Sequence, residues 1–340
     1  MMSGFLNWMQ KQFSSKVLVL LYHRVTEHSS DIWNLSVSPS NFEQHLILLK
    51  KRFRIISEDE LIYGVDNGKL PGKSIVLTFD DGYYDNFQYA YPILSKHNAP
   101  AIFFLPSYFI KNRERFWWDI LEETLLLSEE LPARFNFQVV NQTVDIDLKN
   151  EKKLNSTISE KHRYWKAYEL PPPTKRALLY VELWNLLHKL THIERQPYLD
   201  LIFNWAGLKS SEFKKEAEMC MKKDELKKII KSPLFSIGGH TSTHSALKYH
   251  SRAIQEDEVR KNKQDLEHLN HSKIRSFSYP HGLYNAETIQ IVREADYKIA
   301  FTVNHTPVLK SSSPFEIGRY HVKNYNSSEF EKQIYKWENM

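Results

Sequence analysis

Short apolar runs alternate with segments of helical periodicity along most of the chain. The run Val17–Tyr22 is apolar at every position, as expected for a strand covered on both faces of a parallel sheet. The other strands that the pattern predicts are Ser74–Phe79, Ala101–Leu105, Leu234–Ile237, Arg275–Tyr279, Ile299–Val303 and Phe315–Tyr320. Strands that alternate with helices favour an α/β fold with a parallel sheet, either open or closed into a barrel.

Helical patterns separate these strands. Apolar residues recur at helical spacing from Phe42 to Phe53, and Ser57 with Glu60 forms a capping-box pattern that opens a second helix. Further helices are expected at 253–269 and 286–295, and in a stretch that ends at His97.

Residues 113–231 interrupt this alternation. They contain a polar stretch, a Pro171-Pro172-Pro173 run and two helical patterns at 175–189 and 193–205. We expect a mostly helical insertion in a barrel domain that spans residues 17–340.

Residues 1–16 form a separate amphipathic segment, which either packs on the domain or rests on a membrane surface. The first apolar run is far shorter than the ~20 residues of a membrane span, and it does not follow the short basic start of a signal peptide. We therefore expect a cytoplasmic protein, with peripheral contact to the inner face of the membrane left open.

The composition limits the kinds of molecule that the protein is expected to bind. The chain of 340 residues has a net charge of +5 and no dense basic stripe, so no nucleic-acid partner is expected. The single cysteine, Cys220, excludes a disulfide within the chain and is interpreted as structural. The 8 Trp, 18 Tyr and 19 Phe serve either packing or stacking on sugars.

Two adjacent carboxylates stand at the end of an apolar run, in Thr78-Phe79-Asp80-Asp81-Gly82. Ligands of parallel α/β folds bind at the carboxyl ends of strands. The two side chains diverge, so that one can bind a cation while the other accepts a proton. Alternatively, one caps the next helix and the other is solvated.

Two histidines follow another expected strand, in His240-Thr241-Ser242-Thr243-His244. Residues four apart share a face of a helical turn, which would let both imidazoles bind one ion. The bland alternative is a chance pair among the 15 histidines. One carboxylate and two imidazoles leave metal positions open for water and substrate, and the second carboxylate can act as general base. A third motif, Phe277–Gly282, is either an ordinary turn or places the backbone N–H of Tyr279 as an oxyanion donor.

In this order the three motifs resemble the polysaccharide deacetylase family, the NodB-homology enzymes of carbohydrate esterase family four. The likeness covers roughly residues 17–110 and 232–322. It implies a distorted (β/α) barrel of about seven strands, with Asp80 as general base. It also implies that Asp81, His240 and His244 bind a divalent metal, usually Zn²⁺.

The chain departs from the family pattern at two points. Ser278 stands where relatives often have an arginine that orients the base, and Arg24 is the candidate substitute. No clean motif identifies the general acid, for which His321, His23 and His305 are candidates in that order. Pro280, His281 and Trp117 are the candidate substrate-binding residues.

The resemblance implies hydrolysis of the N-acetyl group of an amino sugar in a polysaccharide or its lipid-linked precursor, in surface-polysaccharide biosynthesis. The expected partner is an N-acetylated glycan or a lipid-linked sugar, and the oligomeric state stays open. The alternatives are an O-acetyl esterase, a non-catalytic carbohydrate-binding protein, and an iron(II) oxygenase with the same ligand types.

Overall fold

The fold is organised around one parallel sheet. The computed structural model describes residues 16–27, 30–208 and 219–340. Seven strands follow one another in the order β11-β10-β9-β6-β5-β1-β12, and β4 pairs with β5 beside this path. Every pairing in this sheet is parallel. The predicted α/β class is confirmed.

The ends of this sheet approach each other and nearly close a barrel. Ile317 pairs with Phe301 of β11 (Ile299–Phe301), and a few residues later β12 (Tyr320–His321) pairs with β1 (Val17–Tyr22). The segment 317–321 therefore pairs with β11 near its start and with β1 at its end. This agrees with the distorted barrel of about seven strands expected from the sequence.

The strands match the apolar runs closely at the centre of the sheet and less closely at its edges. Strands β1, β5 (Ser74–Phe79) and β6 (Ala101–Leu105) have the predicted bounds and are buried at every position. The later strands are shorter or shifted, at β9 (Phe235–Gly239), β10 (Ser276–Ser278), β11 and β12. Three short strands precede β5 in the chain, namely β2 (Arg24–Val25), β3 (Ser36–Val37) and β4 (Arg54–Ile55).

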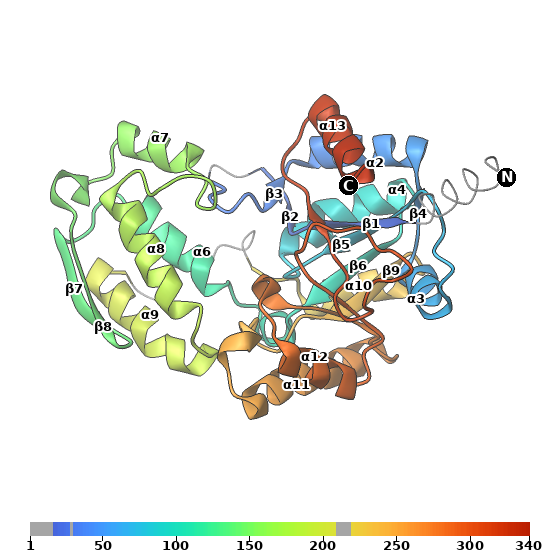
Figure 1. Ribbon diagram of the computed structural model, residues 1–340. Helices are drawn as coiled ribbons and strands as arrows, with labels where there is room; N and C mark the ends of the chain where they lie inside the picture. The colour runs from blue at the N-terminus through green and yellow to red at the C-terminus, as the bar shows by residue number, and fades with distance from the viewer. Residues whose placement is uncertain (1–15, 28–29, 209–218) are drawn as a thin grey trace.

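Helices cover the barrel on opposite sides (Figure 1). The predicted capping box is present, because Ser57 and Glu60 cap α3 reciprocally. The helices outside the β6–β9 connection are α2 (Pro39–Arg52), α3 (Glu58–Asn67), α4 (Tyr91–Lys96), α11 (Arg252–Asn270), α12 (Ala286–Glu294) and α13 (Ser327–Glu338).

The connection between β6 and β9 builds a second lobe, which Figure 1 shows beside the barrel. Its described residues form mostly helices, together with an antiparallel hairpin of β7 (Arg134–Val139) and β8 (Gln142–Asp147) that the sequence pattern did not predict. Its helices are α5 (Ser107–Asn112), α6 (Trp117–Glu122), α7 (Ser156–Tyr164), α8 (Lys175–Leu187), α9 (His192–Ala206) and α10 (Lys223–Lys231). Helix α10 returns to the barrel side.

Among the described residues, no helix is long and apolar enough to cross a bilayer. The expected amphipathic segment at 1–16 lies, except for Lys16, outside the described residues. Its membrane contact and the cytoplasmic location stay predictions.

Candidate active site

The two catalytic motifs meet at the carboxyl ends of β5 and β9. Asp80 continues β5 through a hydrogen bond from its N–H to the Tyr22 carbonyl, at 3.0 Å. The chain then turns sharply, with Asp81 at φ 74° and Gly82 at φ 68°. A Cβ on Gly82 would lie 2.7 Å from Leu105 Cδ2, so this turn requires glycine.

The His240–His244 segment forms a braced loop, so the predicted helical turn is wrong. Thr241 and His244 have φ values of 58° and 55°, outside the helical region. Asn262 of α11 accepts the His240 N–H, and Glu258 of the same helix accepts the Thr243 N–H. The imidazoles converge because α11 holds the loop, rather than through helical spacing.

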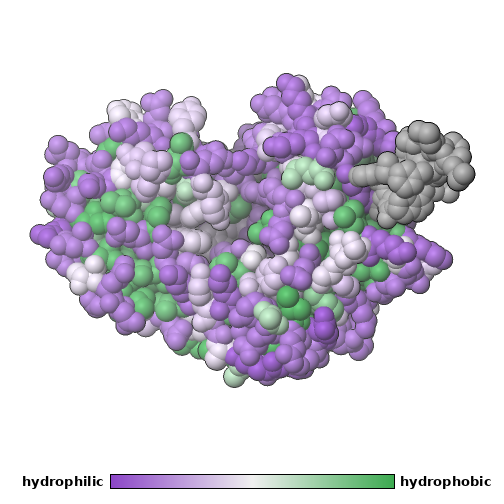
Figure 2. All heavy atoms as spheres, in the orientation of Figure 1, coloured by the Kyte–Doolittle hydropathy of each residue, from purple (hydrophilic) through white to green (hydrophobic). Residues whose placement is uncertain are grey.

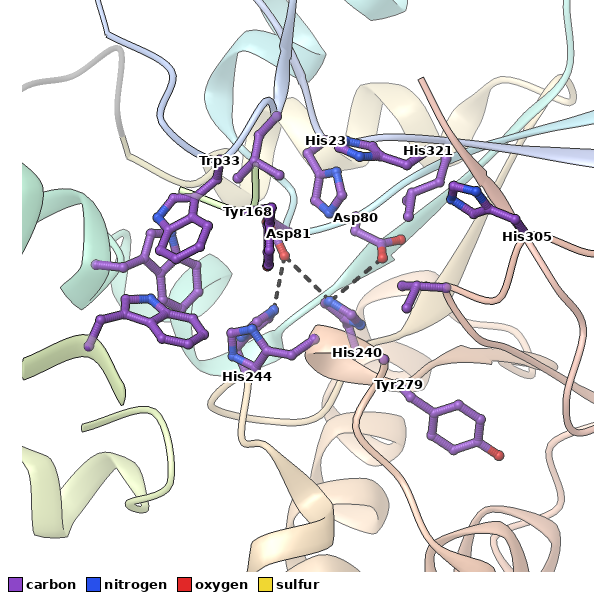
Figure 3. Close-up of a pocket in the computed structure, with 17 residues that line it drawn as sticks. His23, Trp33, Asp80, Asp81, Tyr168, His240, His244, Tyr279, His305 and His321 are labelled. Atoms are coloured by element: carbon purple, nitrogen blue, oxygen red, sulfur yellow. Dashed lines mark ion pairs between the residues drawn. The ribbon is translucent and has the colours of Figure 1, made fainter. Parts of the chain in front are cut away.

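Asp81, His240 and His244 form a buried cluster whose ligand atoms all lie within 4.8 Å of one another. Asp81 Oδ1 lies 3.4 Å from His240 Nε2 and 3.1 Å from His244 Nε2 (Figure 3). Nδ1 of His240 donates to the Ser278 carbonyl at 2.8 Å, which leaves the Nε2 lone pair facing Asp81. Within the described residues this carboxylate oxygen accepts no hydrogen bond. A buried oxygen opposed to nitrogen lone pairs fits a bound cation.

The charge states of the cluster agree with this assignment. Burial raises the pKa of Asp81, but the nearby His244 and His240 outweigh it and hold that pKa well below its usual value. Burial lowers the pKa of His244, because it disfavours the imidazolium, although Asp81 opposes the shift. An ionised carboxylate beside a neutral imidazole is the state in which both groups bind metals.

Arg319 orients Asp80, a role that the sequence analysis gave to the wrong residue. Its guanidinium binds both Asp80 carboxylate oxygens at 2.7 Å, and Ser278 Oγ donates to the same carboxylate at 3.0 Å. The candidate substitute Arg24 instead binds Asp85 at 2.8 Å and stacks on the Tyr83 ring. Arg319 belongs to the segment that closes the barrel, so only the fold brings it to Asp80.

The Asp80 carboxylate is buried and ionised. Burial raises its pKa, but the Arg319 guanidinium and then His240 outweigh that cost and lower the pKa below its usual value. The Asp80 side chain lies 3.9 Å from His240 Nε2. Asp80 therefore lies beside the Asp81–His240–His244 cluster without being part of it.

The three histidines that were candidates for the general acid all line the same pocket. His23 is close enough to Asp81 and Asp80 for both carboxylates to oppose the lowering of its pKa by burial. His321 packs edge-on against His23, with ring centroids 5.3 Å apart. Burial and then His23 lower the pKa of His321 to about 3. His23 is therefore better placed than His321, which the sequence analysis had ranked first.

The backbone N–H of Tyr279 is not an oxyanion donor, which corrects that prediction. It donates to the Phe301 carbonyl at 3.1 Å and so belongs to the β10–β11 pairing. Pro280 has no N–H and does not appear among the described residues that line the pocket. His281, at φ 56°, does line it, with its ring 4.6 Å from that of His244.

Aromatic rings form the wall on the side of the second lobe. Trp118 lies 4.8 Å from the His244 ring, and its indole N–H donates to the Tyr83 hydroxyl at 3.0 Å. The candidate Trp117 does not line this pocket, because it is buried under the Arg195 guanidinium. Trp33, Tyr168 and Trp184 complete the wall. The pocket has a volume of about 340 Å³, and Figure 2 shows the surface hollowed between the two lobes.

The comparisons with known proteins agree with the motifs. The family model described as polysaccharide deacetylase matches residues 67–126 and 197–300. Over these two segments the chain is similar to the polysaccharide deacetylase family. Polysaccharide deacetylases are metal-dependent in general, and Asp81, His240 and His244 of this chain could hold a metal ion.

Two curated relatives match over a limited segment. The putative polysaccharide deacetylase YxkH of Bacillus subtilis is 32% identical over 100 residues, which cover 29% of this chain and 34% of the relative. The poly-β-1,6-N-acetyl-D-glucosamine N-deacetylase of Staphylococcus aureus strain MSSA476 is 33% identical over 108 residues, which cover 28% and 37%. The matched segment thus spans about a third of each relative.

Two solved structures share the fold over nearly the whole chain. IcaB from Ammonifex degensii superposes with a TM-score of 0.57 at 17% identity, covering 96% of this chain and 98% of that one. The Streptococcus pyogenes deacetylase PplD, in complex with acetate, gives 0.54 at 17% identity, covering 93% and 97%. Both structures confirm the deacetylase fold. Because the aligned regions cover 93% and 96% of this chain, they include the second lobe.

Proposed function

We propose that this protein hydrolyses the N-acetyl group of an amino sugar, in a polysaccharide or its lipid-linked precursor, during surface-polysaccharide biosynthesis. One observation carries the proposal. An ionised carboxylate, Asp80, is held by Arg319 beside a separate cluster of cation ligands at the end of a pocket. The S. aureus relative carries the name of a poly-N-acetylglucosamine N-deacetylase, which supports an N-acetylated sugar as substrate.

The ligand set favours zinc. Two imidazole nitrogens and one carboxylate oxygen are common zinc ligands, and three protein ligands leave a position open. A divalent cation bound there supplies Lewis-acid polarisation of the acetyl carbonyl and makes water more acidic. The neutral state of His244 and the ionised state of Asp81 fit this role.

The chain's own groups supply the proton transfers. Asp80 accepts a proton from the attacking water, because Arg319 and Ser278 leave its carboxylate ionised and fixed. The C–N bond breaks as the leaving amine takes a proton, for which we assign His23 as donor. We assign the backbone N–H of His281, a residue that lines the pocket, to the developing oxyanion.

An O-acetyl esterase is the second candidate, because water attack on an ester uses the same base and cation. Acetate release from matched N-acetyl and O-acetyl sugars, measured with protein loaded with Zn²⁺, Co²⁺ or Ni²⁺, tests both. We expect release from the N-acetyl substrate and its loss on chelation. Release from the O-acetyl sugar alone would replace the proposal with the esterase.

Two further alternatives are weaker. A non-catalytic sugar-binding protein does not need an oriented buried base such as Asp80. An iron(II) oxygenase would use the same ligand types, and oxygen consumption without acetate release would indicate it.

A further inference from the structure

Two buried polar residues, Asp85 and Asn86, follow the base Asp80 closely in the sequence. They are 2% and 0% exposed. Neither residue belongs to the cluster of cation ligands, and neither is among the described residues that line the pocket. The reaction proposed above therefore gives them no role, although the same turn of the chain carries the base.

Together they bind three consecutive residues just after β1. Asn86 Nδ2 donates to the His23 carbonyl at 2.8 Å. Asp85 Oδ2 accepts from Arg24 Nε at 2.8 Å, and Asp85 Oδ1 accepts the Val25 N–H at 3.0 Å. A further bond of 2.9 Å from Asn86 Nδ2 to Asp85 Oδ1 joins the two side chains. We call Asp85 and Asn86 the His23 clamp.

Arg24 and Tyr83 keep the clamp in place. The Arg24 and Asp85 side chains are 7% and 3% exposed, and a charged hydrogen bond between such groups is strong and directional. The Arg24 guanidinium also lies 4.1 Å from the centroid of the Tyr83 ring, whose hydroxyl donates to Asp119 of α6 at 2.9 Å. The clamp is therefore held from the barrel and from the second lobe.

The residue that the clamp holds is His23, to which we assign the proton for the leaving amine. His23 lines the pocket, and Figure 3 shows it beside Asp80 and Asp81. A catalytic histidine is commonly oriented by a hydrogen-bond acceptor at its second ring nitrogen. Within the described residues, however, His23 Nδ1 has no hydrogen-bond partner. The direction of its ring therefore depends on its backbone and on packing against His321.

Stability alone does not explain why an asparagine occupies position 86. The side chain is fully buried, yet its Oδ1 has no hydrogen-bond partner among the described residues. A buried polar atom without a partner costs free energy, which an apolar side chain of the same size would avoid. What Asn86 provides in return is the hydrogen bond from Nδ2 to the His23 carbonyl.

We propose that Asp85 and Asn86 position His23 for proton donation to the leaving amine. They are positioning residues, because they act through the backbone of His23 and not on the substrate. This inference rests on the proposed deacetylase function, since an amine leaves only after it has gained a proton, whereas a nitrophenolate leaves without one.

The first test is Asn86→Leu in the metal-loaded full chain. Leucine has a similar volume and leaves no charge unpaired, and thermal unfolding checks that the variant folds. We expect kcat for acetate release from an N-acetyl sugar to fall roughly tenfold, as for a small misplacement of a catalytic group, with KM and metal content unchanged. Hydrolysis of para-nitrophenyl acetate should keep its rate. A merely structural role would change both rates alike, or neither.

A double-mutant cycle with His23→Gln shows whether Asn86 acts through His23. Adding Asn86→Leu to His23→Gln should lower kcat by no more than about twofold further, because the group that the clamp positions is already gone. A further tenfold loss would place the effect of Asn86 elsewhere and overturn the clamp. Asp85→Asn keeps an acceptor for the Val25 N–H but loses the charge opposite Arg24. It should behave in the same way, and it replaces Asn86→Leu if that variant does not fold.

Asn262→Leu is the matched control, because Asn262 is a second fully buried asparagine beside the site. It accepts the His240 N–H at 3.1 Å and donates to the Leu105 carbonyl at 2.9 Å, so it holds the loop of a cation ligand instead of His23. We expect Asn262→Leu to lower the metal content and both hydrolysis rates, and its effect on kcat to add to that of His23→Gln. The same pattern in Asn86→Leu would overturn the clamp.

The failure of the proposed function would look different, because the unaltered protein would then release no acetate from any N-acetyl sugar. The clamp is in that case tested by the rate at which diethyl pyrocarbonate modifies the His23 ring, located by mass spectrometry of peptides. Faster modification in Asn86→Leu than in both the unaltered protein and Asn262→Leu would support the clamp, and equal rates in the three proteins would overturn it. Acetate release with an unchanged kcat in Asn86→Leu would overturn the clamp alone.

Discussion

The Arg319 guanidinium binds both carboxylate oxygens of Asp80, although the two residues are 239 positions apart in the sequence. Both side chains are buried. The guanidinium also reaches Ser278 Oγ at 2.8 Å, so one arginine fixes the base and its serine neighbour together. Such a bidentate pair gives direction as well as charge. The orientation and the ionisation of the Asp80 carboxylate therefore both depend on the segment 317–321.

Replacing this arginine should therefore alter the base rather than the metal site. We expect Arg319→Met to reduce kcat by roughly 100-fold or more and to shift the acid limb of the pH–rate profile to higher pH, because only His240 and His23 then oppose the rise that burial causes in the pKa of Asp80. An uncompensated buried charge also costs about 3–5 kcal/mol of stability. Arg319→Lys keeps the charge, so its kcat should lie between that of the unaltered protein and that of Arg319→Met. An acid limb that stays in place in both variants would assign Arg319 a structural role only.

Substitution of Asp80 and substitution of a cation ligand should differ in their effect on the metal content of the protein. We expect Asp80→Asn to keep its metal and to lose turnover by roughly 10²–10⁴-fold, as for the loss of a general base. His240→Ala and His244→Ala should lose metal and turnover together. Metal analysis by mass spectrometry beside an acetate assay distinguishes the two classes. Wild-type turnover in Asp80→Asn would refute its role.

His23 and His321 provide a matched pair for the general acid. Both are buried imidazoles that line the pocket, but only His23 lies within electrostatic reach of Asp80 and Asp81. We expect His23→Gln to reduce kcat by roughly 100-fold, and His321→Gln to have a clearly smaller effect. A substrate with a better leaving amine should restore part of the His23→Gln rate. The reverse order of effects would return the role to His321.

His45 predicts a pH dependence of stability outside the active site. Its Nε2–H donates to the Tyr325 carbonyl at 2.7 Å, and the Tyr22 hydroxyl contacts Nδ1 at 3.4 Å, which suits the neutral ring. Burial lowers its pKa to about 4, so that between about pH 6.5 and pH 4 the unfolded chain binds a proton that the folded chain does not. Stability from this group is present above pH 6.5 and falls as the pH is lowered.

The measurement is urea unfolding of chelator-treated protein from pH 7 to pH 4. We expect the free energy of unfolding of the unaltered chain to fall more steeply than that of His45→Gln, with a difference that grows to about 3 kcal/mol. Parallel curves for the two proteins would show that His45 does not stay neutral in the fold.

Local sequence pattern determined much of this protein. The mostly apolar runs at Val17–Tyr22 and Ser74–Phe79 indicated strands covered on both faces, and their alternation with helices predicted a parallel sheet. Asp80, Asp81, His240 and His244 were recognisable because each motif directly follows such a strand, and parallel strands bring their carboxyl ends to one edge.

Only the tertiary structure decided which groups support those four side chains. Arg319 reaches Asp80, and Arg24 does not, because the barrel closes through residues 317–321. The Tyr279 N–H donates a hydrogen bond to the neighbouring strand β11, and α11 holds the loop that begins at His240. These contacts join residues that are distant in sequence, so they cannot be predicted from the local pattern of polar and apolar residues. Sequence carries the chemistry of each group, while the packing of strands and lobes sets which groups meet.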